Sequence, residues 1–168
     1  MLAIVNNAAQ AYRNVIPSDC WHEPYMSAEY LCAEIGRNVV FRGFRDSGRL
    51  VGIMGSQRVD DVTLIRHAYV LTEHRRCGIG AALLSCLVNE SERPVLIGTW
   101  KAASWAISFY CKHGFSLVDE RSKNLLLKKY WSISERQVET SVVLADENWF
   151  EKYPERSARA AANFCKQK

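Results

Sequence analysis

The sequence predicts an α/β (α+β) fold with a central mixed sheet, mostly antiparallel with one parallel pair of strands, flanked by helices. Three observations favour it. Two helical stretches come first, and three strands separated by turn signals then form an antiparallel meander. A glycine loop, a helix and a continuous apolar strand follow the third strand, and this spacing is typical of a parallel crossover.

The first half of the chain has clear periodic signals. Residues 2–14 place apolar side chains three and four positions apart, which predicts an amphipathic helix. Ser27 is the expected N-cap of a second helix that ends near Asn38 and has Leu31 and Ile35 one turn apart. Three strands are then expected at 39–45, 50–58 and 62–71.

The second half alternates helices and strands. We expect a buried strand over 95–100, a helix over 102–113 closed by Gly114, a strand from 115 to 118, a helix over 123–131 and a last strand over 140–145. One domain therefore spans 1–146, with an insert at 119–139 between its last two strands. The tail at 147–168 carries Pro154 and then an Ala/Arg-rich stretch, Glu155–Lys168, which we expect to be helical.

Composition narrows the class of protein. A chain of 168 residues with 48% apolar and 24% charged residues is typical of one globular domain. The net charge of +4 suits an anionic cofactor but is too small to favour a nucleic-acid partner. The six cysteines show no metal-ligand spacing, and no signal peptide or membrane-length apolar run is visible. We therefore expect a cytoplasmic protein with reduced thiols, no bound metal and no membrane partner.

The segment Arg75-Arg-Cys-Gly-Ile-Gly80 joins the third strand to a helix and predicts a phosphate site. Its glycines allow backbone amides to approach a ligand, the helix N-terminus is positive, and two arginines add charge. A Walker loop is excluded because no Lys-Ser or Lys-Thr pair follows. A dinucleotide fingerprint fails at its third glycine position, which is Leu83. The pattern Gln/Arg-x-x-Gly-x-Gly/Ala fits at every fixed position.

That pattern, with the strand before it, resembles the acetyl-CoA-binding segment of the GNAT acetyltransferase superfamily. A second segment, Ala106–Phe115, resembles the family's Ala-Ile-x-Phe-Tyr-x-Lys-x-Gly-Phe. The resemblance covers roughly residues 2–146. The chain departs from it in three places: it begins inside the first helix, it has Ala103 where an Asn is common, and the insert 119–139 stands where it could cover the substrate entrance.

The resemblance implies that acetyl-CoA lies between the strands ending at Leu71 and Trp100, which would splay apart. Its pyrophosphate would lie on the helix N-terminus, and its pantetheine arm would pair with the third strand. The amide near Val70 would stabilise the oxyanion of the tetrahedral intermediate. The implied cofactor-binding residues are Tyr69, Val70, Leu71, Arg75, Arg76, Cys77, Gly78, Ile79, Gly80 and Ala81.

Two proton transfers need catalytic residues. Tyr110 matches the family's tyrosine, which implies a role as the acid that protonates the departing thiolate. His67 is a candidate base, because alternation puts it on one face of the strand with Tyr69 and its ordinary pKa suits neutral pH. His22 and Glu23 are rival bases. Cys77 and Cys111 have no His-Asp partners, and we interpret them as small apolar residues.

The predicted reaction is direct transfer of an acetyl group from acetyl-CoA to a primary amine of a small molecule or amino acid. The acceptor pocket is expected to include Trp21, His22, Glu23, Tyr25 and Trp100. A non-catalytic CoA-binding sensor of the same fold is the alternative, and Ala103 favours it mildly. A nucleotide-dependent oxidoreductase is disfavoured by Leu83. Analogy with the family suggests a homodimer.

Overall fold

The computed structural model describes residues 1–153, and these residues form two compact units. Unit 1 comprises residues 1–58 and 65–92, and unit 2 comprises residues 59–64 together with the chain from residue 93. The helix expected over Glu155–Lys168 lies outside the described residues. The domain boundary at residue 146 stays a prediction.

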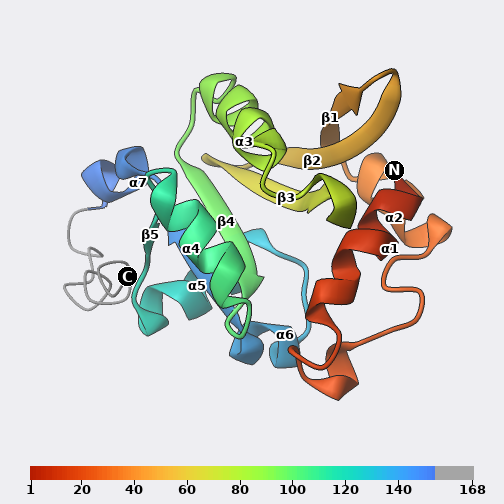
Figure 1. Cartoon of the computed structure of the whole chain (residues 1–168). Coiled ribbons are helices and arrows are strands. Elements are labelled where there is room, and N and C mark those ends of the chain that lie inside the picture. Colours follow the sequence, from red (N-terminus) through yellow and green to blue (C-terminus); the bar gives the residue numbers. More distant parts are fainter. Residues whose placement is uncertain (154–168) are drawn as a thin grey trace. The chain divides into compact units, whose positions relative to one another are not determined.

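Unit 1 contains the N-terminal helices, the first strands and the helix after the glycine loop (Figure 1). Its elements are α1 Leu2–Ala9, η1 Gln10–Tyr12, η2 Ser18–Cys20, α2 Ala28–Gly36, β1 Val40–Asp46, most of β2 Arg49–Val59, most of β3 Val62–Val70, η3 Thr72–His74 and α3 Ile79–Asn89. Unit 2 holds β4 Val95–Trp100, α4 Ser104–Lys112, β5 Ser116–Leu117, α5 Glu120–Tyr130, α6 Glu135–Thr140, β6 Ser141–Ala145 and α7 Glu147–Lys152.

The six strands form one sheet in the order β1-β2-β3-β4-β6-β5. The pairs β1–β2, β4–β6 and β5–β6 are antiparallel, and β3–β4 is the parallel pair. The predicted fold class is therefore confirmed. The start of β3 belongs to unit 2, where the Thr63 amide donates to the carbonyl oxygen of Pro94 at 2.9 Å.

In unit 1, α2 forms where its signals predict, whereas the helix expected over residues 2–14 is α-helical only over Leu2–Ala9 and continues as the 3₁₀ turn η1. α1 buries Ile4, Val5, Ala8 and Ala9 on one face. The side chain of Asn6 accepts from the Met26 amide at 2.9 Å and donates to the Met26 carbonyl at 3.0 Å, so it fixes the loop before α2. Ser27 is the N-cap of α2, as predicted, and accepts from the Tyr30 amide at 3.1 Å.

The buried face of α2 differs from the expected one. Leu31 and Ile35 suggest an apolar stripe, but Ile35 is 51% exposed, whereas Glu34 is fully buried. The polar partners of Glu34 explain this exchange, because a buried carboxylate is tolerated only where hydrogen bonds and opposite charges replace water.

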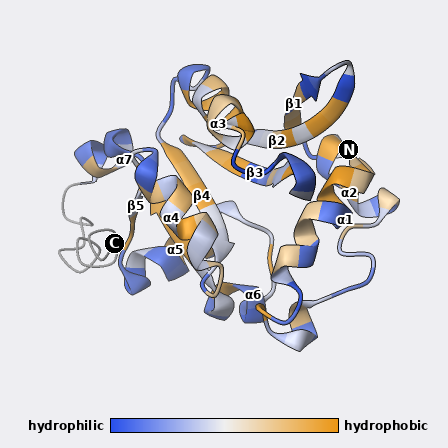
Figure 2. Cartoon of the chain, in the orientation of Figure 1, coloured by the Kyte–Doolittle hydropathy of each residue, from blue (hydrophilic) through white to orange (hydrophobic). Residues whose placement is uncertain are grey.

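Unit 2 has a core of its own. α5 and α6 pack on β6, and α7 packs beside β4, whose first half is hydrophobic (Figures 1 and 2). The insert 119–139 contains α5 and all of α6 except its last residue, and the side chains Leu126, Leu127, Tyr130 and Val138 belong to this core. The sequence predicted α5 but not α6.

Asp61, in the turn before β3, ties that turn to two helices of unit 2. Its carboxylate accepts from the hydroxyls of Tyr130 (2.6 Å) and Tyr153 (2.8 Å) and from the Lys152 ammonium (3.0 Å). The hydrogen bond from Tyr130 is the main reason that the pKa of Asp61 lies far below its ordinary value, although partial burial opposes the shift. Asp61 is therefore ionised at neutral pH.

Candidate functional site: a glycine loop and a polar network in unit 1

The loop that leads into α3 has an unusual backbone. Arg76 (φ 64°) and Gly78 (φ 77°) both adopt the left-handed conformation. Gly78 is the N-cap of α3, no side chain caps the helix, and no acidic residue lies in its first turn. The hydrogen bond from the Ala82 amide to the Gly78 carbonyl (3.0 Å) begins the helix. Helix geometry leaves the amides before Ala82 without intrahelical acceptors, and their positive end suits an anion.

The two arginines of the loop do different things. The Arg75 guanidinium donates to the carbonyl oxygen of Ala8 at 2.9 Å, so it fastens the loop to the last turn of α1. Arg76 is exposed. Arg75 is exposed as well, and only one of its N–H groups is bound in this way, so the role of both arginines at an anion stays a prediction.

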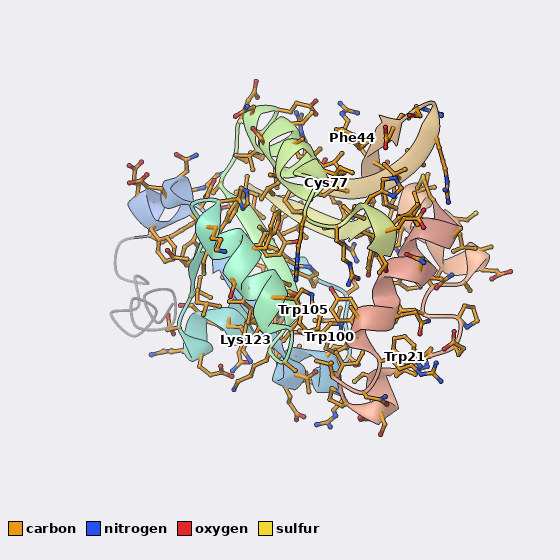
Figure 3. All side chains as sticks on the ribbon, viewed as in Figure 1. Trp21, Phe44, Cys77, Trp100, Trp105 and Lys123 are labelled. Carbon is orange, nitrogen blue, oxygen red and sulfur yellow. The ribbon has the colours of Figure 1, made fainter. Side chains whose placement is uncertain are left out.

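Cys77 lies in the same loop, close to the start of α3 (Figure 3). It is an exposed free thiol whose Sγ lies 3.5 Å from the Arg75 carbonyl oxygen, and its interpretation as a small apolar residue stays a prediction. Cys20, Cys32 and Cys86 are also free. Cys111 is disulfide-bonded, so the expectation of reduced thiols fails at that position.

The end of β3 presents its amides in two directions. The Leu71 amide donates to the Val51 carbonyl on β2 at 2.9 Å, so it is not available to a ligand. Because amides alternate along a regular strand, we expect the Val70 amide to point away from β2. The Thr72 amide is held by the side-chain oxygen of Asn7 at 2.9 Å. The role of Val70 at the cofactor stays a prediction.

His67 interrupts β3. Its φ of 53° is left-handed, a conformation that costs a residue other than glycine about 1–2 kcal/mol. Neighbouring side chains of a regular strand point to opposite faces, but Arg66 and His67 both contact the Oε2 atom of Glu34, at 2.8 and 2.6 Å. The alternation behind the expected shared face of His67 and Tyr69 is therefore broken, and His67 is directed to α2.

Two aromatic rings hold the His67 ring. Phe41 on β1 stacks on it at 5.8 Å between centroids, and Tyr30 on α2 meets it edge-on at 6.4 Å. Phe41 pairs with Gly55 on β2, and a Cβ at Gly55 would lie 3.2 Å from the Phe41 ring and 3.1 Å from the Arg66 carbonyl oxygen. The missing side chain at Gly55 therefore leaves room for Phe41 to approach β3.

Glu34 and Arg66 were missed by the sequence analysis. Glu34 is fully buried, and Arg66, 14% exposed, also donates to the side-chain oxygen of Gln57 at 2.9 Å. Burial raises the pKa of Glu34, but the hydrogen bond from His67 and the charge of Arg66 outweigh burial and hold this pKa below its ordinary value. The sequence gives no signal for this, because a glutamate in an exposed helix would look the same.

Part of the predicted acceptor pocket is an aromatic cluster. The rings of Tyr12, Trp21 and Tyr69 each contact the ring of Tyr25, with centroids 5.8, 5.5 and 6.5 Å apart. This cluster joins the loop after α1 to the end of β3. The other two pocket candidates from that loop, His22 and Glu23, are exposed (Trp21 marks the loop in Figure 3).

The remaining candidates lie in unit 2. Trp100 ends β4 (Figure 3). Ala103, which precedes α4, is buried and gives the helix no side-chain cap. Tyr110 on α4 is 6% exposed, and its ring meets those of its neighbours Phe109 and Phe115 edge-on at 5.1 and 6.3 Å. Burial raises the pKa of Tyr110, so its hydroxyl keeps the proton at neutral pH.

Within residues 1–153, none of the helices is both long and apolar enough to span a bilayer.

The family model for the acetyltransferase (GNAT) domain matches residues 29–117, more than half of the chain. Among curated proteins, the UPF0157 protein YqkA of Bacillus subtilis (strain 168) is 28% identical over 123 residues. That match covers 71% of this chain but only 35% of YqkA, so the chain spans about a third of the length of this relative.

Solved structures share the fold. The PaiA N-acetyltransferase of Thermoplasma acidophilum, in complex with coenzyme A, superposes with a TM-score of 0.63 at 18% identity, over 86% of this chain and 89% of its own. A GNAT family acetyltransferase of Elizabethkingia anophelis with acetyl-CoA bound gives 0.55 at 21% identity, over 72% of this chain and 83% of its own. At these identities the likeness concerns the fold, and the domain match settles the assignment: the chain belongs to the GNAT acetyltransferase family.

Proposed function

We propose that this protein is an N-acetyltransferase that moves the acetyl group of acetyl-CoA directly to a primary amine of a small molecule or amino acid. The observation that carries the proposal is the N-terminus of α3, which has no side-chain cap and follows a loop with two left-handed residues, Arg76 and Gly78. Such an end binds a diphosphate through its amides.

The cofactor is acetyl-CoA, as its relatives with CoA or acetyl-CoA suggest. Its pyrophosphate lies on the amides from Cys77 to Ala81, with the Arg76 side chain beside it. Its pantetheine arm runs along the end of β3, and the Val70 amide donates to the thioester oxygen as negative charge develops there. This direction of the amide is supported by the bond of the next amide, Leu71, to β2.

The reaction needs a base and an acid. The acceptor arrives as an ammonium ion and gives one proton to His67. The neutral amine nitrogen of the acceptor then attacks the thioester carbon. A C–N bond forms and the C–S bond breaks. The second amine proton leaves to solvent as the tetrahedral intermediate collapses. Tyr110 protonates the departing thiolate and is reprotonated from water, and its burial keeps it in the acid form until then.

The acceptor binds against the aromatic cluster of Tyr12, Trp21, Tyr25 and Tyr69, which offers an apolar wall next to the end of β3. Neither the net charge of +4 nor the exposed positions of His22 and Glu23 favour a polycation. We therefore favour an amine on a partly apolar body. Homodimer assembly and a cytoplasmic location stay predictions.

A CoA-binding sensor without turnover is the second candidate. The observation in its favour is Ala103, which is buried, gives α4 no side-chain cap and replaces the asparagine common in the family.

Thermal melts and a turnover assay separate these functions. Acetyl-CoA should raise the melting temperature, whereas NAD, which also carries a pyrophosphate and an adenosine, should not. Release of the CoA thiol in the presence of a panel of amines should identify the acceptor. Equal stabilisation by NAD would refute the cofactor assignment. Stabilisation by acetyl-CoA without thiol release from any amine would favour the sensor.

A further inference from the structure

The Glu34 carboxylate lies at the centre of a network that joins α2 to β3. It is fully buried, and three nitrogen groups contact it: His67 Nε2 at 2.6 Å, Arg66 Nη2 at 2.8 Å and Arg37 Nη1 at 3.3 Å. Glu34 lies on α2, and its side chain points to His67 on β3. That arrangement has a chemical consequence for the histidine.

The consequence concerns the tautomer of His67. Glu34 is ionised at neutral pH, because its hydrogen bond from His67 and the charge of Arg66 more than offset its burial and lower its pKa. An ionised carboxylate only accepts hydrogen bonds, so the Nε2 atom of His67 at 2.6 Å must carry a hydrogen. In the neutral imidazole the lone pair then sits on Nδ1, and this is the only ring atom that can take up a proton.

The ring is also held in place from the other sides. Phe41 stacks on it and Tyr30 meets its edge, while the left-handed backbone at His67 directs it to α2. A strained backbone persists only where its surroundings determine it, and such residues cluster at functional sites. The His67 side chain is 11% exposed, so it is nearly enclosed but not sealed from solvent.

We propose that Glu34 is a positioning residue for acetyl transfer: it holds His67 as the Nε2–H tautomer and leaves Nδ1 as the base for the incoming ammonium ion. This inference rests on the proposed function. His67 precedes Val70 by three residues, about 10 Å along a strand, so the proton travels through bridging water. The amine loses H⁺, the imidazole becomes imidazolium, and Nε2–H keeps its bond to the carboxylate; His67 later returns the proton to solvent.

The charges around His67 set the direction of the pH effect. Glu34 favours the imidazolium, whereas Arg66 opposes it, and Arg37 reaches the same carboxylate from the end of α2. Tyr30 is the other titratable group facing the ring; burial and the charge of Glu34 raise its pKa, so it stays neutral. Replacing Glu34 with a neutral residue therefore removes the negative charge beside the His67 ring and leaves the positive charge of Arg66.

A test that does not depend on turnover reads the tautomer directly. Long-range ¹H–¹⁵N spectra recorded at a pH where the imidazole is neutral should show His67 as the Nε2–H tautomer in the wild-type protein, and Glu34→Gln should remove this preference. Glu29→Gln, on the same helix but exposed, is the matched control and should leave the His67 signals unchanged. A wild-type His67 with its hydrogen on Nδ1 would overturn the proposal.

Turnover then tests the role in catalysis. In Glu34→Gln, kcat should fall at least tenfold and the acidic limb of its pH profile should move to lower pH, with an unchanged KM for acetyl-CoA. His67→Asn, which tolerates the left-handed backbone, should also lose activity, and adding Glu34→Gln to it should cause no further loss of kcat. If the fall in kcat of the double variant equals the product of the two single-variant falls, or if folded Glu34→Gln keeps the wild-type pH profile, the network only supports the fold. A wild type without turnover would refute both the proposed function and this role, whereas normal wild-type turnover with a fully active Glu34→Gln would refute this role alone.

Discussion

Gly78→Ala tests the loop before α3 with little disturbance of the packing. Gly78 has a φ of 77°, and a Cβ built on it meets no atom within 4 Å. The change therefore adds no clash. It places a methyl group on the open side of the loop, where the proposed diphosphate approaches the amides, and it forces an L-residue into the left-handed conformation.

These two effects set the expected losses of stability and of coenzyme A affinity in Gly78→Ala. The left-handed backbone costs an L-residue about 1–2 kcal/mol, and the stiffer unfolded chain returns about 0.4–1 kcal/mol. A net loss of about 1 kcal/mol corresponds to a fall in melting temperature of about 2–4 °C for a chain of this size. A methyl group against the diphosphate should weaken the binding of coenzyme A at least tenfold, which is about 1.4 kcal/mol of binding free energy.

Gly48→Ala is the matched control. Gly48 lies in the β1–β2 turn of the same unit, has a φ of 81°, and its Cβ would also meet nothing within 4 Å. Both variants should melt at similar temperatures, but only Gly78→Ala should bind coenzyme A more weakly in isothermal titration calorimetry. Equal affinities for the two variants would refute the reasoning that the diphosphate lies on this loop.

Three further predictions concern other residues. Arg76→Ala should weaken coenzyme A most clearly at low salt, whereas Arg75→Ala should mainly lower the melting temperature because Arg75 fastens the loop to α1; the reverse pattern would contradict this division. Asp61→Asn should lower the free energy of unfolding at pH 7 by about 1–2 kcal/mol in denaturant titrations, whereas Asp60→Asn, at its exposed neighbour, should lower it by almost nothing; equal losses would count against the Asp61 network. Because folding lowers the pKa of Asp61, its contribution to stability is present above the unfolded pKa and disappears as the pH falls below about 4. Tyr110→Phe should slow thiol release about 100-fold with little change in cofactor affinity, and unchanged turnover would remove Tyr110 from the acid role.

Most of the fold could be predicted because its signals are local. The apolar run at Val95–Trp100 gives β4 at the predicted residues, and the Ser27 N-cap and the left-handed Gly114 mark their helices as expected. α6 was missed although it has a capping box between Ser134 and Gln137, because its six residues are too few for a periodic pattern.

The features of the candidate site that depend on distant contacts could not be predicted. The glycine loop was evident because its residues are consecutive. The burial of Glu34 depends on Arg66 and His67, more than 30 residues away, and nothing local distinguishes it from an exposed helix glutamate. The left-handed backbone at His67 has no local sequence signature either, because no glycine or turn residue marks the position. The hydrogen bond from Arg75 to the Ala8 carbonyl could not be predicted either, because Ala8 lies 67 residues away in the sequence.

The central claim is that the loop and the first turn of α3 bind the diphosphate of coenzyme A. Titration of ¹⁵N-labelled protein with coenzyme A, followed amide by amide, tests it most directly. We predict that the largest shifts fall on the amides from Arg76 to Ala81 and on that of Val70, while the Leu71 amide, bonded to β2, changes little. Saturable binding that leaves the amides from Arg76 to Ala81 unshifted would contradict the account.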